Sequence, residues 1–325
     1  MRKILASEQA GLVLVIFVLG ILLTGLAGSH VDRLTGAEVN NFLNSYTLIQ
    51  TATDASFFAI MAVGATIVII SGGIDLSVGS VVALSTVVVA LLLRAGSGPV
   101  LAALGTVMAA AVCGALNGLL ITRLQVVPFI VTLGTMLLVR GAAKGLADER
   151  RIEAPISWLN DLLRTAQDGG GLLLPAGIWL TAALALVVAF TLRYTRFGRH
   201  LFAIGSNERT ARLCGVRINL DKLAVYTIAS AMAGVAGLLE FAKLSVGDPT
   251  VAIGLELDVI AAVIIGGGSL LGGKGSVVGT IAGAAIMAII QIGCSQQGLP
   301  NWVQEIITGT IIVGAVALDR WRSRS

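Results

Sequence analysis

Residues 56–93 read SFFAIMAVGATIVIISGGIDLSVGSVVALSTVVVALLL, an apolar run interrupted by the segment SGGIDLSVGS at 71–80. Consecutive glycines weaken a helix and leave backbone groups unpaired. At membrane depth such backbone is tolerated only where it is buried in protein or lines a wet cavity. The stretch therefore predicts apolar spans that are broken at membrane depth, not joined by an ordinary loop.

A second segment, GGGSLLGGKGS at 266–276, interrupts apolar sequence in the same way. Each segment contains a Gly-Gly pair, at positions 72 and 267. Each also ends in Gly-Ser with Val-Val directly after it, at 79–82 and 275–278. Corresponding interrupted segments point to an internal repeat and to broken helices near a transport path. We predict repeat halves of about 1–172 and 173–325 within one transmembrane domain, 1–325.

The composition supports this class of fold. The chain has 325 residues, of which 56% are hydrophobic and 12% charged, whereas a soluble domain has roughly 45–50% apolar and about 25% charged residues. This excludes a soluble globular protein, and the apolar content excludes disorder. We predict an all-α polytopic membrane protein surrounded by lipid, and we assign the net charge of +4 to cytoplasmic loops, not to nucleic-acid binding.

Ten apolar segments are long enough to be considered as spans. With the N-terminus in the cytoplasm, 14 of the 22 lysines and arginines fall on the inner side, as the positive-inside rule requires, so both termini are expected there. The first segment is longer than the apolar region of a signal peptide and is expected to stay as a helix. The predicted spans are 10–27, 56–71, 79–93, 100–121, 126–146, 174–192, 223–244, 259–271, 277–292 and 302–318.

Asp75 is the most informative single residue, because a carboxylate within apolar sequence costs about 2.5–3.5 kcal/mol on insertion scales unless it is solvated or paired. With Ser77 it could shape a hydrophilic path or a hinge. Alternatively, Asp75 caps a helix that starts near Leu76. The two interpretations are compatible, and both stay open at this point.

Further polar and glycine positions, together with the aromatic residue Phe129, are candidates for a translocation path. Asparagine and threonine in membrane helices also commonly join neighbouring helices by hydrogen bonds, which is the alternative for Asn117 and Thr132. The three cysteines and two histidines are too dispersed for a metal site or a disulfide framework, so we expect no catalytic residues, metal or cofactor. The predicted path comprises Gly72, Gly73, Asp75, Ser77, Asn117, Phe129, Thr132, Gly267, Gly268 and Ser269.

The segment 193–222 is the longest charged stretch on the predicted inner side. Its pattern predicts a helix of about two turns, which is too short to be stable in water alone. It needs a docking surface, either on this protein or on a soluble partner. Its signals are a cap at Ser206 or Asn207, Glu208 in the first turn, Arg209 and Arg212 on the exposed side, and Gly215 after the last turn.

Several stretches together resemble a known family, the inner-membrane permease subunits of bacterial ABC importers for monosaccharides of the ribose, xylose, arabinose and galactose group. The stretches lie in order along most of the chain. They are SGGIDLSVG at 71–79, VPFIVTLG at 127–134, GRHLFAIGS at 198–206, Gly-Val at 215–216, GLELD at 254–258 and the segment 262–275.

The resemblance implies a multi-pass permease of the bacterial inner membrane that is not itself an enzyme. It implies three partners: a cytoplasmic ATP-binding subunit, a periplasmic solute-binding protein, and a second permease, which is either a copy of this chain or a sister chain. Solute would cross by alternating access as the ATPase pushes on a docking segment. That segment comprises Arg199, Ser206, Asn207, Glu208, Arg209, Ala211, Arg212 and Gly215.

The resemblance does not select one sugar, and related permeases carry autoinducer-2 or inositol. A rival from another class is an ion-coupled secondary transporter, which would carry intramembrane carboxylates for coupling. Asp75 is nearly alone in the spans, which favours the ABC importer.

Overall fold

The computed structural model describes residues 2–31, 38–165 and 174–322. The boundary between the predicted repeat halves, at 172 and 173, lies outside these residues. The helices are α1 Arg2–Leu26, α2 Ser45–Ile70, α3 Val78–Arg94, α4 Pro99–Leu124, α5 Pro128–Leu146, α6 Ala176–Tyr194, α7 Arg196–Ser206, α8 Glu208–Leu213, α9 Ile218–Leu244, α10 Leu255–Ile265, α11 Val277–Gln296, α12 Asn301–Arg322 and the short 3₁₀ helix η1 Trp158–Leu163.

The predicted all-α fold is confirmed, and each of the ten predicted spans overlaps one helix. Among the described residues, six helices are long and apolar enough to cross a membrane: α2, α4, α5, α6, α9 and α11. The apolar part of α1 and the whole of α3 are shorter. Helix α10 has only 11 residues and ends at Ile265, six residues before the predicted limit of 271, because Gly266 and Gly267 terminate it.

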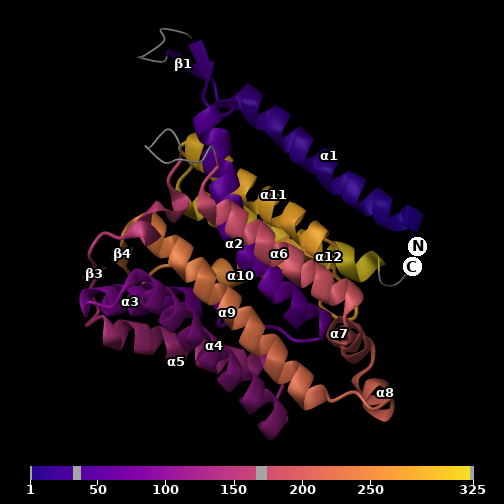
Figure 1. Ribbon diagram of the computed structural model, residues 1–325. Helices are drawn as coiled ribbons and strands as arrows, with labels where there is room; N and C mark the ends of the chain where they lie inside the picture. The colour runs from indigo at the N-terminus through magenta and orange to yellow at the C-terminus, as the bar shows by residue number, and fades with distance from the viewer. Residues whose placement is uncertain (1, 32–37, 166–173, 323–325) are drawn as a thin grey trace.

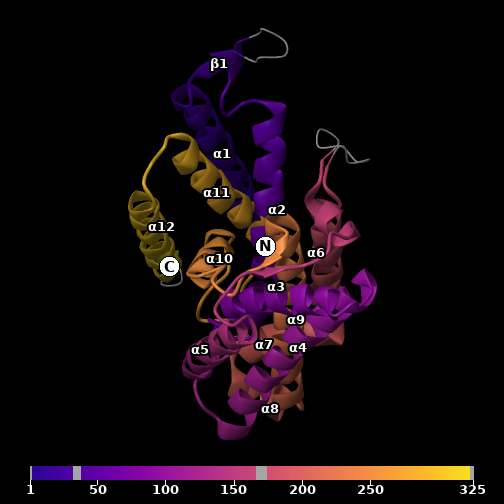
Figure 2. The ribbon, with the colours of Figure 1, turned by 90° about the vertical axis from the view of Figure 1, so that its left-hand side faces the viewer.

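The helices form a bundle in which α1, α6 and α9 all run from upper left to lower right (Figure 1). The start of α1 and the end of α12 lie at the right of this view, and α7 and α8 lie below them at the lower right. Two small antiparallel sheets lie toward the opposite edge (Figures 1 and 2). In one, β1 Ser29–Val31 pairs with β2 Glu38–Asn40, and in the other, β3 Ile152–Glu153 pairs with β4 Val246–Gly247.

Burial divides the helices into an inner and an outer group. Most residues of α2 and α3 are buried, and α9, α10 and α11 complete the core around them. Helices α4, α5 and α6 instead expose large apolar side chains such as Leu101, Leu137 and Leu186. An exposed surface of this kind is expected where helices face lipid tails.

The charged segment between α6 and α9 differs from the prediction, because it forms two helices instead of one. Thr195 caps α7 by accepting a hydrogen bond from the Gly198 N–H at 3.2 Å. Asn207 ends α7 and caps α8, accepting from the Thr210 N–H at 3.0 Å. Of the two predicted caps Asn207 is therefore correct, and Ser206 is the last residue of α7.

Candidate functional site

The two glycine-rich breaks begin with the same helix-ending motif. After α2, the Gly72 N–H bonds the Ile69 carbonyl and the Gly73 N–H bonds the Val68 carbonyl. After α10, Gly267 and Gly268 make the same pair of bonds to Ile264 and Val263. This is the Schellman cap, which needs a residue with positive φ, and Gly72 and Gly267 have φ of 79° and 89°. The same pair of bonds also ends α3, α8 and α11, so this motif is not specific to the breaks, and the internal repeat stays a prediction.

The breaks also meet one another in space. The Gly273 N–H donates to the Ile70 carbonyl at 2.9 Å, which joins the second break to the end of α2. Gly205 of α7 lies at the same point, because a Cβ built on it would overlap the Ile70 carbonyl oxygen and the Gly273 nitrogen. A Cβ on Gly272 would lie 2.8 Å from the Gly205 oxygen and 2.9 Å from the Gly72 Cα. We call this contact of α7 with both breaks the glycine junction.

The interior of the first break is polar. Asp75 Oδ1 accepts hydrogen bonds from the Ser77 N–H at 2.8 Å and from the Ser77 hydroxyl at 2.6 Å. Asn117 Nδ2 of α4 donates to the same hydroxyl at 2.9 Å. All three side chains are buried. Helix α3 begins at Val78 with Ser77 as its N-cap, so Asp75 does not cap the helix directly but closes the turn that precedes it.

The remaining predicted path residues are distributed around the breaks. Thr132 of α5 donates to the Ile74 carbonyl at 3.2 Å, so it contacts the first break. Gly267, Gly268 and Ser269 form the start of the second break. Phe129 does not join the polar interior: its side chain is 45% exposed, and its backbone carbonyl accepts a bond from Thr132.

The sequence analysis missed Tyr226 of α9, whose hydroxyl lies beside Gly73. The ring is 1% exposed, and a Cβ built on Gly73 would overlap the Tyr226 hydroxyl. Tyrosine in a membrane helix gives no periodic signal, so only its position in the bundle identifies it. The first break is thus surrounded by side chains from α4, α5 and α9.

A second polar region, near the end of α9, was also missed. Arg140 of α5 donates to the carbonyls of Pro249 and Val251 at 3.1 and 2.5 Å. Asp248 accepts from the Thr250 N–H and from Arg151 Nε, the latter at 2.7 Å. These contacts fix the segment that leads from α9 into α10.

Asp248 lies outside the spans, and its pKa is shifted. Burial favours the neutral form, but the hydrogen bonds from Thr250 and the ion pair with Arg151 outweigh it and lower the pKa of Asp248 below its ordinary value. The side chain is 3% exposed, while Arg151 is 74% exposed. The carboxylate is therefore held ionised at neutral pH.

Buried acidic residues in the helices include one that the sequence analysis did not select. Asp258 of α10 is buried and accepts a hydrogen bond from Gln291 Nε2 of α11 at 3.0 Å. In the described ranges there is no group of three or more residues suited to hold a metal ion.

Helices α7 and α8 are tied to the start of α9. His200 Nδ1 lies 3.0 Å from Asp221, and Lys222 donates to Glu208 at 2.6 Å. Ala211 is buried against Ile204 and Ile218. Gly215 follows α8 with φ of 84°, as predicted.

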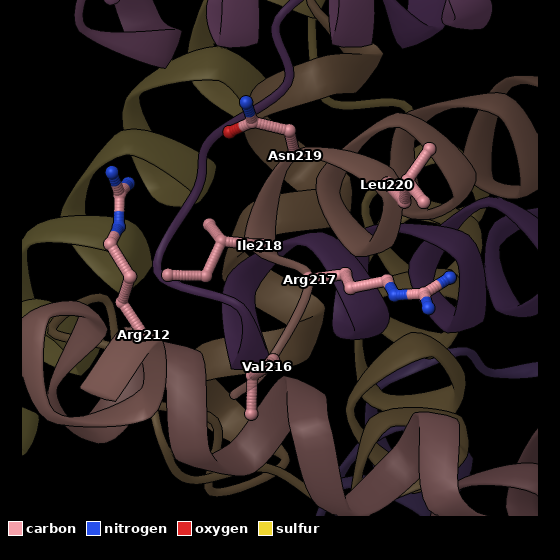
Figure 3. A pocket seen from close by; sticks show the side chains of 6 residues that line it. All are labelled: Arg212, Val216, Arg217, Ile218, Asn219 and Leu220. Atoms are coloured by element: carbon pink, nitrogen blue, oxygen red, sulfur yellow. The ribbon is translucent and has the colours of Figure 1, made fainter. Parts of the chain in front are cut away.

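The outer face of this helix pair is charged and carries one exposed apolar residue. Arg199, Arg209 and Arg212 are exposed, and Leu213 is 88% exposed. Beside them lies a hollow of about 310 Å³. In Figure 3 its two arginines extend to opposite sides of Ile218. The hollow is lined by Arg212, Val216, Arg217, Ile218, Asn219 and Leu220.

A bundle of apolar helices with two broken spans, joined to a charged helix pair at one edge, defines a membrane transport protein. Comparison with known families gives the particular family. The model of the branched-chain amino acid transport system permease component matches residues 47–316. The chain therefore belongs to this family of transport permeases, and the predicted class, an ABC-importer permease of the inner membrane, is confirmed.

Individual relatives cover most of the chain. The ribose import permease protein RbsC of Escherichia coli K12 is 37% identical over 86% of this chain and 87% of its own length. The D-allose transport system permease protein AlsC of the same organism is 32% identical, over 87% and 86%. The L-arabinose ABC transporter permease protein AraH of Azospirillum brasilense is 34% identical, over 97% and 88%. No solved structure matches the chain.

Proposed function

We propose that this chain translocates a monosaccharide across the membrane. A periplasmic solute-binding protein delivers the sugar, and a cytoplasmic ATP-binding subunit drives the transport. The support for a sugar is that relatives named for ribose, D-allose and L-arabinose match at 32–37% identity. Because three sugars occur at similar identity, the proposal concerns the class of solute and leaves the individual sugar open. Hydrolysis of ATP belongs to the partner subunit.

The glycine junction is the observation that carries the mechanism. Gly205 of α7 contacts both the end of α2 and the second break. A displacement of α7 is therefore transmitted directly, by backbone contact, to both broken spans. Packed interiors have low compressibility and transmit strain. Displacement of α7 would then move both breaks and alternate the access of a solute path between the two sides.

The docking surface for the ATP-binding subunit is the exposed face of α7 and α8. A leucine that is 88% exposed between arginines suits a partner groove with an apolar floor and an acidic rim, because apolar anchors surrounded by polar contacts dominate the energy of interfaces. Leu213 is the proposed anchor, with Arg209 and Arg212 at its sides. A hydrogen bond between His200 and Asp221 and an ion pair between Lys222 and Glu208 hold this surface against α9.

The orientation follows from this docking site. The N- and C-terminal ends lie toward the same edge of the bundle as α7 and α8 (Figure 1), so a cytoplasmic ATPase there puts both termini in the cytoplasm. The periplasmic protein would dock at the opposite edge, where Arg151 and Asp248 fix the segment before α10. The resemblance supports pairing with a second permease, which is either a second copy or a sister chain.

Reconstitution in vesicles tests the proposal. The wild-type chain should co-purify with a nucleotide-binding subunit and support vanadate-sensitive uptake of a sugar presented by the binding protein. Uptake driven by a proton gradient without any partner would contradict it.

A variant sharpens the test of the docking surface. Leu213→Glu should retain the inserted permease but reduce co-purification with the ATPase, since it places a charge on the apolar anchor. Leu43→Glu is the matched control. Leu43 is also exposed, at 57%, but lies between β2 and α2, away from α7 and α8, so this variant should leave co-purification unchanged. Equal co-purification of wild type and Leu213→Glu would exclude this docking surface.

A further inference from the structure

The hollow beside α8 lies where α9 begins, and its lining is basic. It has a volume of about 310 Å³ and is lined by Arg212 and by residues 216–220. Two of these six residues are arginines and none is acidic. The charge of the hollow therefore suits an anionic group.

The two arginines serve different sides of the hollow. Arg212 lies 3.4 Å from Glu208 of the same helix and extends away from Arg217, on the other side of Ile218 (Figure 3). Arg217 extends instead to the side on which Leu220 lies (Figure 3). Arg212 thus belongs to the docking surface of α8, whereas Arg217 points along the start of α9.

Arg217 is exposed, and no ion pair between described residues includes it. The neighbouring carboxylates are bonded elsewhere. Glu208 accepts a hydrogen bond from Lys222 at 2.6 Å, and Asp221 lies 3.0 Å from His200 Nδ1. The guanidinium of Arg217 is therefore available to an anion from outside the chain.

The length of α9 places Arg217 at the level of lipid headgroups. The helix has 27 residues and is about 40 Å long at 1.5 Å per residue. This length is close to the thickness of a bilayer with its headgroup layers, which is about 40–45 Å. Arg217 directly precedes the helix, so it lies in the headgroup layer when α9 spans the membrane.

Exposed apolar side chains continue from Arg217 toward the middle of the membrane. Leu220, in the first turn of α9, is 58% exposed, and Ile228, about two turns further along, is 39% exposed. A cationic group at headgroup level, followed by apolar side chains on the same helix, matches the order of phosphate and acyl chain in a phospholipid.

We propose that Arg217 binds the phosphate of an anionic phospholipid, one acyl chain of which lies along Leu220 and Ile228. A guanidinium group presents its donors in a fork that fits two phosphate oxygens. With the orientation proposed above, the lipid belongs to the cytoplasmic leaflet, where basic residues attract anionic headgroups. The leaflet rests on that orientation, whereas binding of the lipid does not depend on it.

Native mass spectrometry of the full chain in detergent tests the site, with phosphatidylglycerol or phosphatidylcholine added. The wild-type chain should bind several-fold more phosphatidylglycerol, because the choline cation is repelled by Arg217. Arg217→Gln should lower phosphatidylglycerol binding several-fold. Equal binding of the two lipids to the wild type, or undiminished phosphatidylglycerol binding to the variant, would overturn the proposal.

Arg193→Gln is the matched control for the loss of one positive charge. Arg193 is an exposed arginine in the last turn of α6, lies outside the hollow, and has its guanidinium carbon 5.4 Å from the centroid of the Tyr194 ring. This variant should bind phosphatidylglycerol as the wild type does. An equal loss in both variants would show a general effect of charge and would overturn the site.

A soluble competitor separates a lipid site from a simple phosphate site. Glycerol phosphate in excess should not displace phosphatidylglycerol, and Leu220→Ser should reduce phosphatidylglycerol binding, because the acyl chain contributes to affinity. Complete displacement by glycerol phosphate, or undiminished binding by Leu220→Ser, would overturn the proposed lipid contact.

Co-purification with the ATP-binding subunit separates the lipid from a protein partner. Arg217→Gln should co-purify with the subunit as the wild type does, since Arg217 lies outside α7 and α8. Reduced co-purification together with unchanged lipid binding would assign Arg217 to the subunit contact and overturn the proposal. The lipid measurements use the permease alone, so their result is independent of the proposed transport function.

Discussion

The backbone N–H of Gly273 donates a hydrogen bond of 2.9 Å to the carbonyl of Ile70. This bond joins the end of α2 to the second break, and Gly205 of α7 packs against both the Ile70 carbonyl and the Gly273 nitrogen. Two interrupted spans and a surface helix, which are far apart in sequence, are thereby in direct backbone contact.

Gly205→Ala should weaken the link between ATP hydrolysis and transport. The added methyl group would overlap the Ile70 carbonyl, and overpacking of this kind costs about 1–3 kcal/mol. We expect reduced solute uptake and reduced stimulation of the partner ATPase in reconstituted vesicles, with the chain still inserted.

Gly134→Ala in α5 is the matched control, because a Cβ at that position meets no atom within 4 Å. It should leave uptake and ATPase stimulation at wild-type values. Normal coupling in Gly205→Ala would show that contact at the glycine junction is not needed for transport.

Ala211→Pro should abolish stimulation of the ATPase while the permease remains in the membrane. The Ala211 N–H donates to the Asn207 carbonyl at 2.9 Å, and a proline removes that bond and disturbs the helix by about 3 kcal/mol or more. ATPase activity with and without the permease measures the effect. Wild-type stimulation in this variant would mean that α8 is not the docking element.

Asp75→Asn should lower uptake with little loss of stability. An asparagine oxygen can accept the same two bonds from Ser77, so the turn before α3 is kept, but the titratable carboxyl group is replaced by a neutral amide. The measurements are thermal unfolding in detergent and uptake in vesicles. Unchanged uptake would show that Asp75 only orders the turn before α3, which is the structural role that the capping interpretation gives it.

Acid should remove the stabilisation that Asp248 provides. Because the pKa of Asp248 is lowered in the folded chain, its contribution is complete above the ordinary value of 3.8 and is lost as pH falls through the folded value. The melting temperature of wild type should exceed that of Asp248→Asn by a constant amount near neutral pH, and the difference should shrink in acid below about pH 4. A difference that grows on acidification would contradict the assigned sign.

The elements were largely predictable from sequence. Every predicted apolar segment contains a helix, because a long apolar run in lipid can satisfy its backbone only as a helix. Helix α7 was missed although Phe197, Leu201 and Ile204 follow the i, i+4, i+7 spacing of one helix face, so its signal was present in the sequence. The end of α10 was misplaced because Leu270 and Leu271 continue the apolar sequence beyond the glycines.

The candidate site was predictable only in part. Asp75, Ser77 and Asn117 were selected as polar residues in apolar sequence and lie together in the structure. Tyr226 and Asp258 were missed. Tyr226 stands in no motif, and Asp258 ends the GLELD stretch but acquires its hydrogen-bond partner, Gln291, from another helix. Phe129 was selected as an aromatic residue that could face a sugar, but it is 45% exposed and lies away from the polar interior of the first break.

The sequence by itself determined that the protein lies in a membrane, how many apolar segments it has, and where glycines interrupt two of them. These features follow from local composition and backbone chemistry. Only the tertiary structure decided that both breaks meet α7 at Gly205 and that Tyr226 lies beside Gly73. Such contacts join positions that are distant in the chain. They depend on how whole helices pack, which no local pattern encodes.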